Sequence, residues 1–144
     1  MKSAVIVYGS TTGNTQRVAG WIQEALSSAG TKADISDVSE MEPASAAPYD
    51  LIVLGASTWG QGEIQDDFVS FYDGMTADVF AGKKVAVFGC GDSGMFPDYF
   101  CRAVDLIAEK VKECGGEIAS DPLRVDGDVR GHRSDIEDWA KGLA

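Results

Sequence analysis

Hydrophobic positions in this chain alternate between two spacings. Residues 4–8 form a continuous apolar run, and from residue 14 to 29 the apolar side chains recur at intervals of three and four. The first pattern is typical of a strand buried on both faces, and the second of an amphipathic helix that ends near Gly30. The alternation therefore begins with a strand and a helix.

The two spacings continue to the end of the chain. Further strands are expected at residues 32–38, 51–54, 84–88 and 117–125, the last broken around Pro122. Further helices are expected at residues 64–72, 99–114 and 134–143. Ser134 and Glu137 form a capping-box pattern that predicts an N-cap at Ser134. Alternating strands and helices predict an α/β fold with a parallel sheet and helices on both faces.

Length and composition fit one domain, and residues 1–144 contain no repeat or linker. Twelve basic residues against 23 acidic ones give a net charge of −11, which disfavours nucleic acid and anionic membranes. Such a surface favours partners with basic patches, although the charge could serve solubility alone. The apolar run at residues 4–8 is too short for a signal peptide, and no run approaches the ~18 residues of a membrane span. The three cysteines lack zinc-ligand spacing, so we expect a cytoplasmic protein without a metal.

A polar loop joins the first predicted strand to the first predicted helix. Residues 9–15 read GSTTGNT, with small side chains that let backbone N–H groups close around an anion. Four hydroxyls and one amide add neutral donors, and the absence of lysine excludes a Walker A loop. The loop predicts a site for a single phosphate, with a polar turn and an N-cap as the alternative.

A second polar loop follows the predicted strand at residues 51–54. Residues 55–62 place Trp59 among glycines and hydroxyls, where a large aromatic ring favours stacking on a planar ligand over packing in the core. Because the carboxyl ends of parallel strands meet at one edge, this loop and the phosphate loop are expected to share a site.

A third loop, residues 89–94, reads GCGDSG and matches two unrelated motifs. The dinucleotide pattern needs a helix directly afterwards, which Pro97 disfavours. The protease nucleophile pattern needs a catalytic histidine, whereas the one histidine of the chain, His132, precedes the last helix of an α/β alternation. A loop of backbone donors beside a ligand is the better interpretation. Cys90 and Cys101 bracket it, and we expect them to be small buried residues near the site.

Together the three loops resemble those of flavodoxins, and the similarity is strongest to the short-chain flavodoxins of sulfate-reducing bacteria. It spans nearly the whole chain, in order. The resemblance implies a flavodoxin-like three-layer sandwich whose five-stranded parallel sheet has the order 2-1-3-4-5, with a bound flavin mononucleotide (FMN).

The resemblance also implies which residues contact FMN. The phosphate would be bound by Ser10, Thr11, Thr12, Asn14 and Thr15, with Gly13 permitting the close turn. Ser57 and Thr58 would approach the phosphate and ribityl chain, Trp59 would stack on the ring, and the peptide of Gly60 and Gln61 would meet flavin N5. The third loop would contribute Cys90, Gly91, Asp92, Tyr99, Phe100 and Cys101, and the second stacking side chain would come from Phe96, Met95 or Tyr99, in that order.

The function implied is a low-potential one-electron carrier, not an enzyme, that acts as a monomer between redox proteins. An FMN-dependent NAD(P)H:quinone oxidoreductase on the same fold is the alternative, and we see no extra segment that would build its second substrate pocket. Compared with the family pattern, residues 60–64 are shorter and less acidic, and residues 94–97 are longer. The potentials are therefore expected to differ from the family norm.

Overall fold

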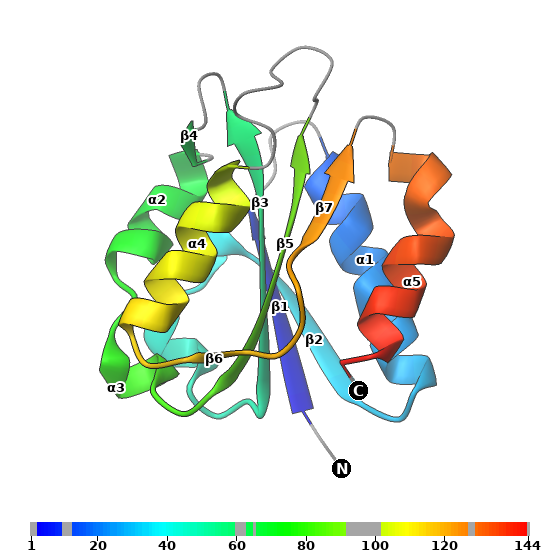
Figure 1. Ribbon diagram of the computed structural model, residues 1–144. Coiled ribbons are helices and arrows are strands. Elements are labelled where there is room, and N and C mark those ends of the chain that lie inside the picture. Colours follow the sequence, from blue (N-terminus) through cyan, green and yellow to red (C-terminus); the bar gives the residue numbers. More distant parts are fainter. Residues whose placement is uncertain are drawn as a thin grey trace.

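A β-sheet forms the middle layer of the protein, and helices cover both of its faces (Figure 1). The computed structural model describes residues 3–9, 13–59, 63–64, 66–91, 102–126 and 129–143. Its strands are β1 (Ser3–Gly9), β2 (Lys32–Asp37), β3 (Leu51–Trp59), β4 (Glu63–Ile64), β5 (Lys84–Gly91), β6 (Glu117–Ile118) and β7 (Leu123–Asp126).

The strand order confirms the predicted parallel sheet. The order is β2-β1-β3-β5-β6, with β7 also paired to β5. Strands β6 and β7 are the two halves of the predicted broken strand, and Pro122 lies between them. Strand β4 is a two-residue addition that pairs antiparallel with β3. The predicted order 2-1-3-4-5 is thus present, and β2, which is more polar than β1, lies at one edge.

Among the described residues, five helices pack around the sheet. They are α1 (Asn14–Ser28), α2 (Asp66–Asp73), α3 (Ala77–Phe80), α4 (Arg102–Glu113) and α5 (Arg133–Lys141), joined in places by the 3-10 turns η1 (Val38–Glu40), η2 (Pro43–Ala46) and η4 (Val129–His132). Helices α1 and α5 pack on one face, and α2, α3 and α4 on the other (Figure 1). The short α3 and the 3-10 turns were not predicted.

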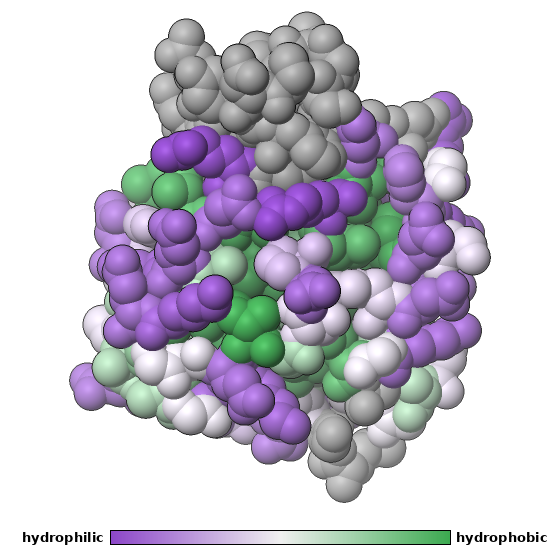
Figure 2. Space-filling model, viewed as in Figure 1, coloured by the Kyte–Doolittle hydropathy of each residue, from purple (hydrophilic) through white to green (hydrophobic). Residues whose placement is uncertain are grey.

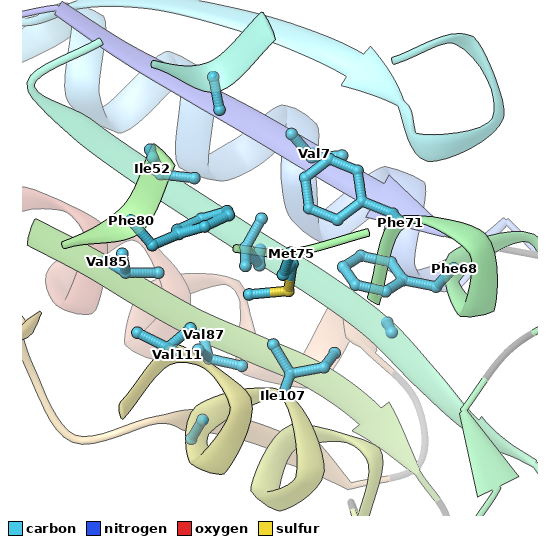
Figure 3. Packing of buried hydrophobic residues seen from close by; sticks show 14 of the residues in the cluster. Val7, Ile52, Phe68, Phe71, Met75, Phe80, Val85, Val87, Ile107 and Val111 are labelled. Atoms are coloured by element: carbon cyan, nitrogen blue, oxygen red, sulfur yellow. The ribbon is translucent and has the colours of Figure 1, made fainter. Parts of the chain in front are cut away.

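Alternate residues of the central strands β1, β3 and β5 enter two separate cores. Val5 and Val7 of β1 face α2 to α4, whereas Ala4 and Ile6 face α1 and α5. Figure 3 shows the first of these cores, in which Phe68, Phe71 and Phe80 lie beside the valines of the central strands. Burial on both faces explains why β1, β3 and β5 are continuous apolar runs.

Three expectations about element boundaries are wrong. Ile64 does not begin the second helix but lies in β4, and α2 begins at Asp66. Strand β3 continues beyond residue 54 to Trp59, because residues 55–57 pair with β1 or β5 and residues 58–59 with β4. Helix α5 has its N-cap at His132, and Ser134 lies inside the helix. The reason is that turn η4 runs directly into α5, so Glu137 pairs with Arg133 one turn earlier, at 2.8 Å, and forms no capping box.

The face that carries α4, β7 and α5 is largely polar, with apolar side chains visible between the polar ones (Figure 2). None of the helices formed by the described residues has the length and apolar character needed to span a bilayer.

Candidate functional site at the carboxyl edge of the sheet

The ends of three central strands meet at one edge of the sheet. In the parallel register Gly9 of β1 lies beside Ala56 of β3, and Ala56 lies beside Gly89 of β5. One step further, Ser57 lies beside Cys90. The three polar segments singled out from the sequence therefore begin at the same edge, as predicted.

The amino end of α1 lies at this edge and begins at Gly13. Gly13 is the N-cap, with φ +91° and ψ −10°, and as a glycine it has no side chain of its own with which to cap the helix. A Cβ added there would meet no atom within 4 Å, so the left-handed backbone, and not crowding, requires glycine. The first turn contains no acidic residue. The positive end of the helix dipole is thus suited to an anion.

Thr15 and Cys90 connect this helix to the sheet. Thr15 is fully buried and Cys90 is 6% exposed, and the two side chains are hydrogen-bonded. Burial raises the pKa of the Cys90 thiol to about 11, although the bond to Thr15 lowers it in part. The thiol is therefore protonated at neutral pH. Its burial agrees with the expectation for Cys90 and makes it a poor nucleophile.

The segment that contains Trp59 is a strand and not the loop that the sequence indicated. Thr58 pairs with Ile64 and Trp59 with Glu63, so β3 and β4 form a hairpin. The backbone of Trp59 is therefore held in place by its pairing with β4. A fixed backbone position is a requirement for an aromatic residue that stacks on a ligand.

Tyr8 belongs to this edge and was not predicted as a site residue. It is half-buried, and its pKa is raised first by burial and then by the carboxylates of Asp37 and Glu40. Asp37 lies beside Tyr8 in the β1–β2 register. The predicted strand order already places the first strand next to the second, but only the observed register brings Asp37 beside Tyr8. The edge near β1 and β2 is consequently electronegative.

Eleven of the predicted site residues lie outside the part of the chain that the structure describes. They are Ser10, Thr11, Thr12, Gly60, Gln61, Asp92, Met95, Phe96, Tyr99, Phe100 and Cys101. His132 lies in η4, and its Nε2 is 3.0 Å from the carbonyl oxygen of Asp126. Within the described ranges, no three His, Cys, Asp or Glu side chains gather as a metal site would require.

Comparison with known proteins identifies the family. A family model described as Flavodoxin matches residues 6–139. The flavodoxin of Maridesulfovibrio salexigens is 42% identical over 147 aligned residues, which cover 100% of this chain and 98% of the relative. That of Nitratidesulfovibrio vulgaris (strain Miyazaki F) is also 42% identical, over 97% of this chain and 95% of the relative.

The fold agrees with this similarity. The solved structure of a short-chain flavodoxin associated with a bacterial microcompartment matches with a TM-score of 0.90 and 26% identity, over 99% of this chain and 97% of that one. A family match along nearly the whole chain, full-length relatives at 42% identity and the matching fold lead to one conclusion: the chain belongs to the flavodoxin family, among its short-chain members.

Proposed function

We propose that this chain is a low-potential one-electron carrier that moves electrons between redox proteins through a non-covalently bound FMN. As a flavodoxin it is an electron-transfer flavoprotein with FMN as its cofactor, and not an enzyme. The quinone oxidoreductase alternative is therefore not retained. When bound, FMN supplies a ring that accepts and releases electrons, and the protein holds the ring and adjusts its potential. Residues 1–144 would act as one monomeric domain.

One arrangement supports FMN at the carboxyl edge above all others. The amino end of α1, with glycine as its N-cap and no acidic residue in its first turn, lies beside the ends of β3 and β5. A helix amino end suits a phosphate dianion, and the adjoining strand ends supply backbone groups for the rest of the molecule. We assign the phosphate to the family positions, which are Ser10, Thr11, Thr12, Gly13, Asn14 and Thr15.

The ring would lie over the outer ends of β3 and β5. Pairing of Trp59 with Glu63 holds the Trp59 backbone in a strand, and Gly91 continues β5 toward the third loop. We assign ring contacts to Trp59, Gly60, Gln61, Asp92, Tyr99 and Cys101, with Phe96, Met95 or Tyr99 on the outer face. Ser57 and Thr58 would meet the ribityl chain.

A low potential would follow from the acidic residues of this chain, among which Asp37 and Glu40 lie near Tyr8 at the carboxyl edge. Residues 33–82 contain no lysine or arginine but ten of the 23 acidic residues, namely Asp34, Asp37, Glu40, Glu42, Asp50, Glu63, Asp66, Asp67, Asp73 and Asp78. The rest of the chain has 13 acidic residues against 12 basic ones, so this segment carries nearly all of the net charge of −11. Negative charge near the ring raises the free energy of the reduced anionic cofactor and lowers its potential.

Reduction of the reconstituted protein tests the carrier function. The FMN-free protein is mixed with FMN, and visible spectra are recorded during stepwise reduction at known potentials. We expect a yellow protein that takes up electrons in two separated one-electron steps, the second at low potential. A protein that takes up no FMN, or one reduced in a single two-electron step, would refute the proposal.

The acidic side chains near Tyr8 form a docking surface for basic redox proteins in this proposal. Glu40 is exposed and close enough to Tyr8 to raise its pKa, which places the carboxylate near the site. Glu113 is also exposed, but it is the last residue of α4 and shortly precedes β6, which pairs with the first residues of β5 at the opposite edge of the sheet. The variants Glu40→Lys and Glu113→Lys change the net charge equally and therefore form a matched pair.

Electron transfer to a basic c-type cytochrome at low salt distinguishes these variants. Glu40→Lys should slow the bimolecular rate severalfold more than Glu113→Lys, because local charge steers docking. The difference should fade at about 0.5 M salt, where screening is strong. Equal slowing by both variants would mean that only the net charge matters.

A further inference from the structure

We propose that Arg17 steers the phosphate of FMN to the amino end of α1 by its charge, without being one of the phosphate ligands. This inference rests on the proposed function, in which the phosphate binds at that end of the helix. A protein with a net charge of −11 repels a phosphate dianion as a whole, and the phosphate ligands assigned above are all neutral. A single cation close to the site therefore has a large influence on capture of the cofactor.

Arg17 lies one helical turn from the N-cap of α1. Its backbone N–H donates to the carbonyl oxygen of Gly13, at 3.0 Å, which closes the first turn of the helix. One turn rises about 5.4 Å, and the Cα–Cβ bond of a helical residue tilts toward the amino end. Because Arg17 is exposed, its guanidinium can come within about 10 Å of a phosphate at this end, which is the Debye length at 0.1 M salt.

The charge of Arg17 is not neutralised by a neighbour on the described part of the chain. Arg17 and Glu24 are the two charged residues between residues 3 and 31. Glu24 lies two turns further along α1 and pairs with Arg133 of α5 at 3.6 Å. None of the ion pairs formed by the described residues includes Arg17. Its field therefore extends into the solvent at the amino end of the helix.

This position of a cation is unfavourable for the helix itself. The helix dipole disfavours positive charge in the first turn and favours negative charge there. The other described helices follow this rule, with Asp66 at the start of α2, Asp78 in α3, Asp105 in α4 and Asp135 in α5. Helix α1 has no acidic residue in its first turn, and Arg17 closes that turn. The charge of Arg17 thus does not stabilise α1, which favours a role in attracting an anion.

The size of the steering effect follows from Coulomb's law. At about 9 Å in water and about 10 mM salt, one positive charge raises the local concentration of a dianion about three- to fivefold. Such an attraction increases the association rate and needs no contact in the complex. At about 0.5 M salt the Debye length falls to roughly 4 Å, so the attraction nearly vanishes.

The experiment measures association of FMN and riboflavin, which differ in the phosphate, with the FMN-free protein by stopped-flow quenching of flavin fluorescence at pH 8. Arg17→Gln removes the charge and Arg17→Lys keeps it. Lys32→Gln is the matched control, because it changes the net charge equally. Lys32 is exposed and begins β2 beside Ser3, at the opposite edge of the sheet from the site.

We expect Arg17→Gln to slow FMN association about three- to fivefold at about 10 mM salt, with riboflavin unchanged. Arg17→Lys and Lys32→Gln should stay within about 1.5-fold of wild type, and all four proteins should converge at about 0.5 M salt. Urea unfolding of the FMN-free protein should show Arg17→Gln to be at least as stable as wild type, because the cation opposes the helix dipole.

Three results would overturn the inference. Equal slowing by Arg17→Gln and Lys32→Gln would show that only the net charge acts. Equal slowing of FMN and riboflavin by Arg17→Gln would show that Arg17 acts by packing. A difference that persists at about 0.5 M salt would show that the guanidinium contacts the phosphate directly and is one of its ligands.

The two flavins also separate this inference from the proposed function. Wild-type protein that binds neither flavin would refute the proposed function itself. Wild type that binds FMN and riboflavin equally well would refute the assignment of the phosphate to the amino end of α1. Wild type that prefers FMN, with an Arg17→Gln variant that captures FMN just as fast, would refute only the role of Arg17.

Discussion

Gly89 lies where β5 approaches both its neighbouring strand and helix α4, and its replacement by alanine is a sharp test of the packing. A Cβ at this position would lie 2.3 Å from Cγ2 of Val104 and 2.6 Å from the carbonyl oxygen of Ala56. Both distances are far below ordinary van der Waals contact. Gly89→Ala therefore forces β5 away from β3, from α4 or from both.

The size of the destabilisation depends on whether the Val104 methyl group and the Ala56 carbonyl can move away from the added Cβ. Val104 is fully buried in the core of α4, so its methyl group has little room to rotate away. The Ala56 oxygen belongs to the backbone of β3, which is paired with Gly89 in register. Overpacking in a core costs about 1–3 kcal/mol, and two clashes, one with backbone, indicate the upper end. We expect a loss of about 3 kcal/mol, or about 10 °C in Tm.

Urea unfolding of the FMN-free protein, followed by circular dichroism, measures this loss without the stabilisation that a bound cofactor adds. Gly20→Ala is the matched control: Gly20 lies inside α1 with no atom within 4 Å of an added Cβ. That variant should gain about 0.5–1 kcal/mol from helix propensity. The double variant Gly89→Ala/Val104→Ala should be more stable than the sum of its single changes predicts.

A Gly89→Ala protein within about 0.5 kcal/mol of wild type would refute this account of the packing, because a real overlap with backbone cannot be relieved that cheaply. Strict additivity of Gly89→Ala and Val104→Ala would refute it in part, since it would show that the Val104 methyl is not what the new Cβ meets.

Three further outcomes are expected. Trp139→Phe loses the hydrogen bond of Nε1 to the Asp121 carbonyl oxygen, 2.9 Å long, and should cost about 1 kcal/mol in urea unfolding, with no loss if that bond is unimportant. Stability should fall between pH 9 and 11, because the unfolded Cys90 thiol ionises from its ordinary pKa of 9.0 while the folded thiol keeps its proton up to about 11. Cys90→Ser should remove the part of that decline below pH 10, while the raised pKa values of Tyr8 and Tyr49 leave a decline above it. An unchanged decline below pH 10 in the variant would contradict the assignment to Cys90. Gly13→Ala should destabilise the FMN-free protein by about 1–2 kcal/mol through its left-handed φ of +91°, and Gly13→Asn by less, as melting curves would show.

The alternation of strand and helix patterns was enough to predict the architecture. Apolar runs such as residues 4–8 need cover on both faces, and that requirement leaves little choice other than a parallel sheet between two helix layers. Local sequence patterns also predicted the break of the last strand at Pro122 and the end of α1 near Gly30, whose φ is +91°. The edge that carries the site followed from the same rule, since strand ends in such folds meet on one side.

Contacts between distant segments decided the remainder. Residues 55–59 have the composition of a loop, yet pairing with β1, β5 and β4 makes them a strand. Ser134 has the local features of an N-cap, but η4 continues into α5 and starts the helix earlier at Arg133. Such outcomes depend on backbone hydrogen bonds to residues far along the chain, which no local pattern contains.

The link between Thr15 and Cys90 has the same origin. The sequence around either residue gives no indication of the other, because the two are 75 positions apart and come into contact only when α1 packs on β5. The sequence by its spacing determines which residues are buried and which loops lie at the binding edge. The tertiary structure alone determines which buried polar groups form hydrogen bonds with each other, because a hydrogen bond requires a definite distance and direction between two side chains.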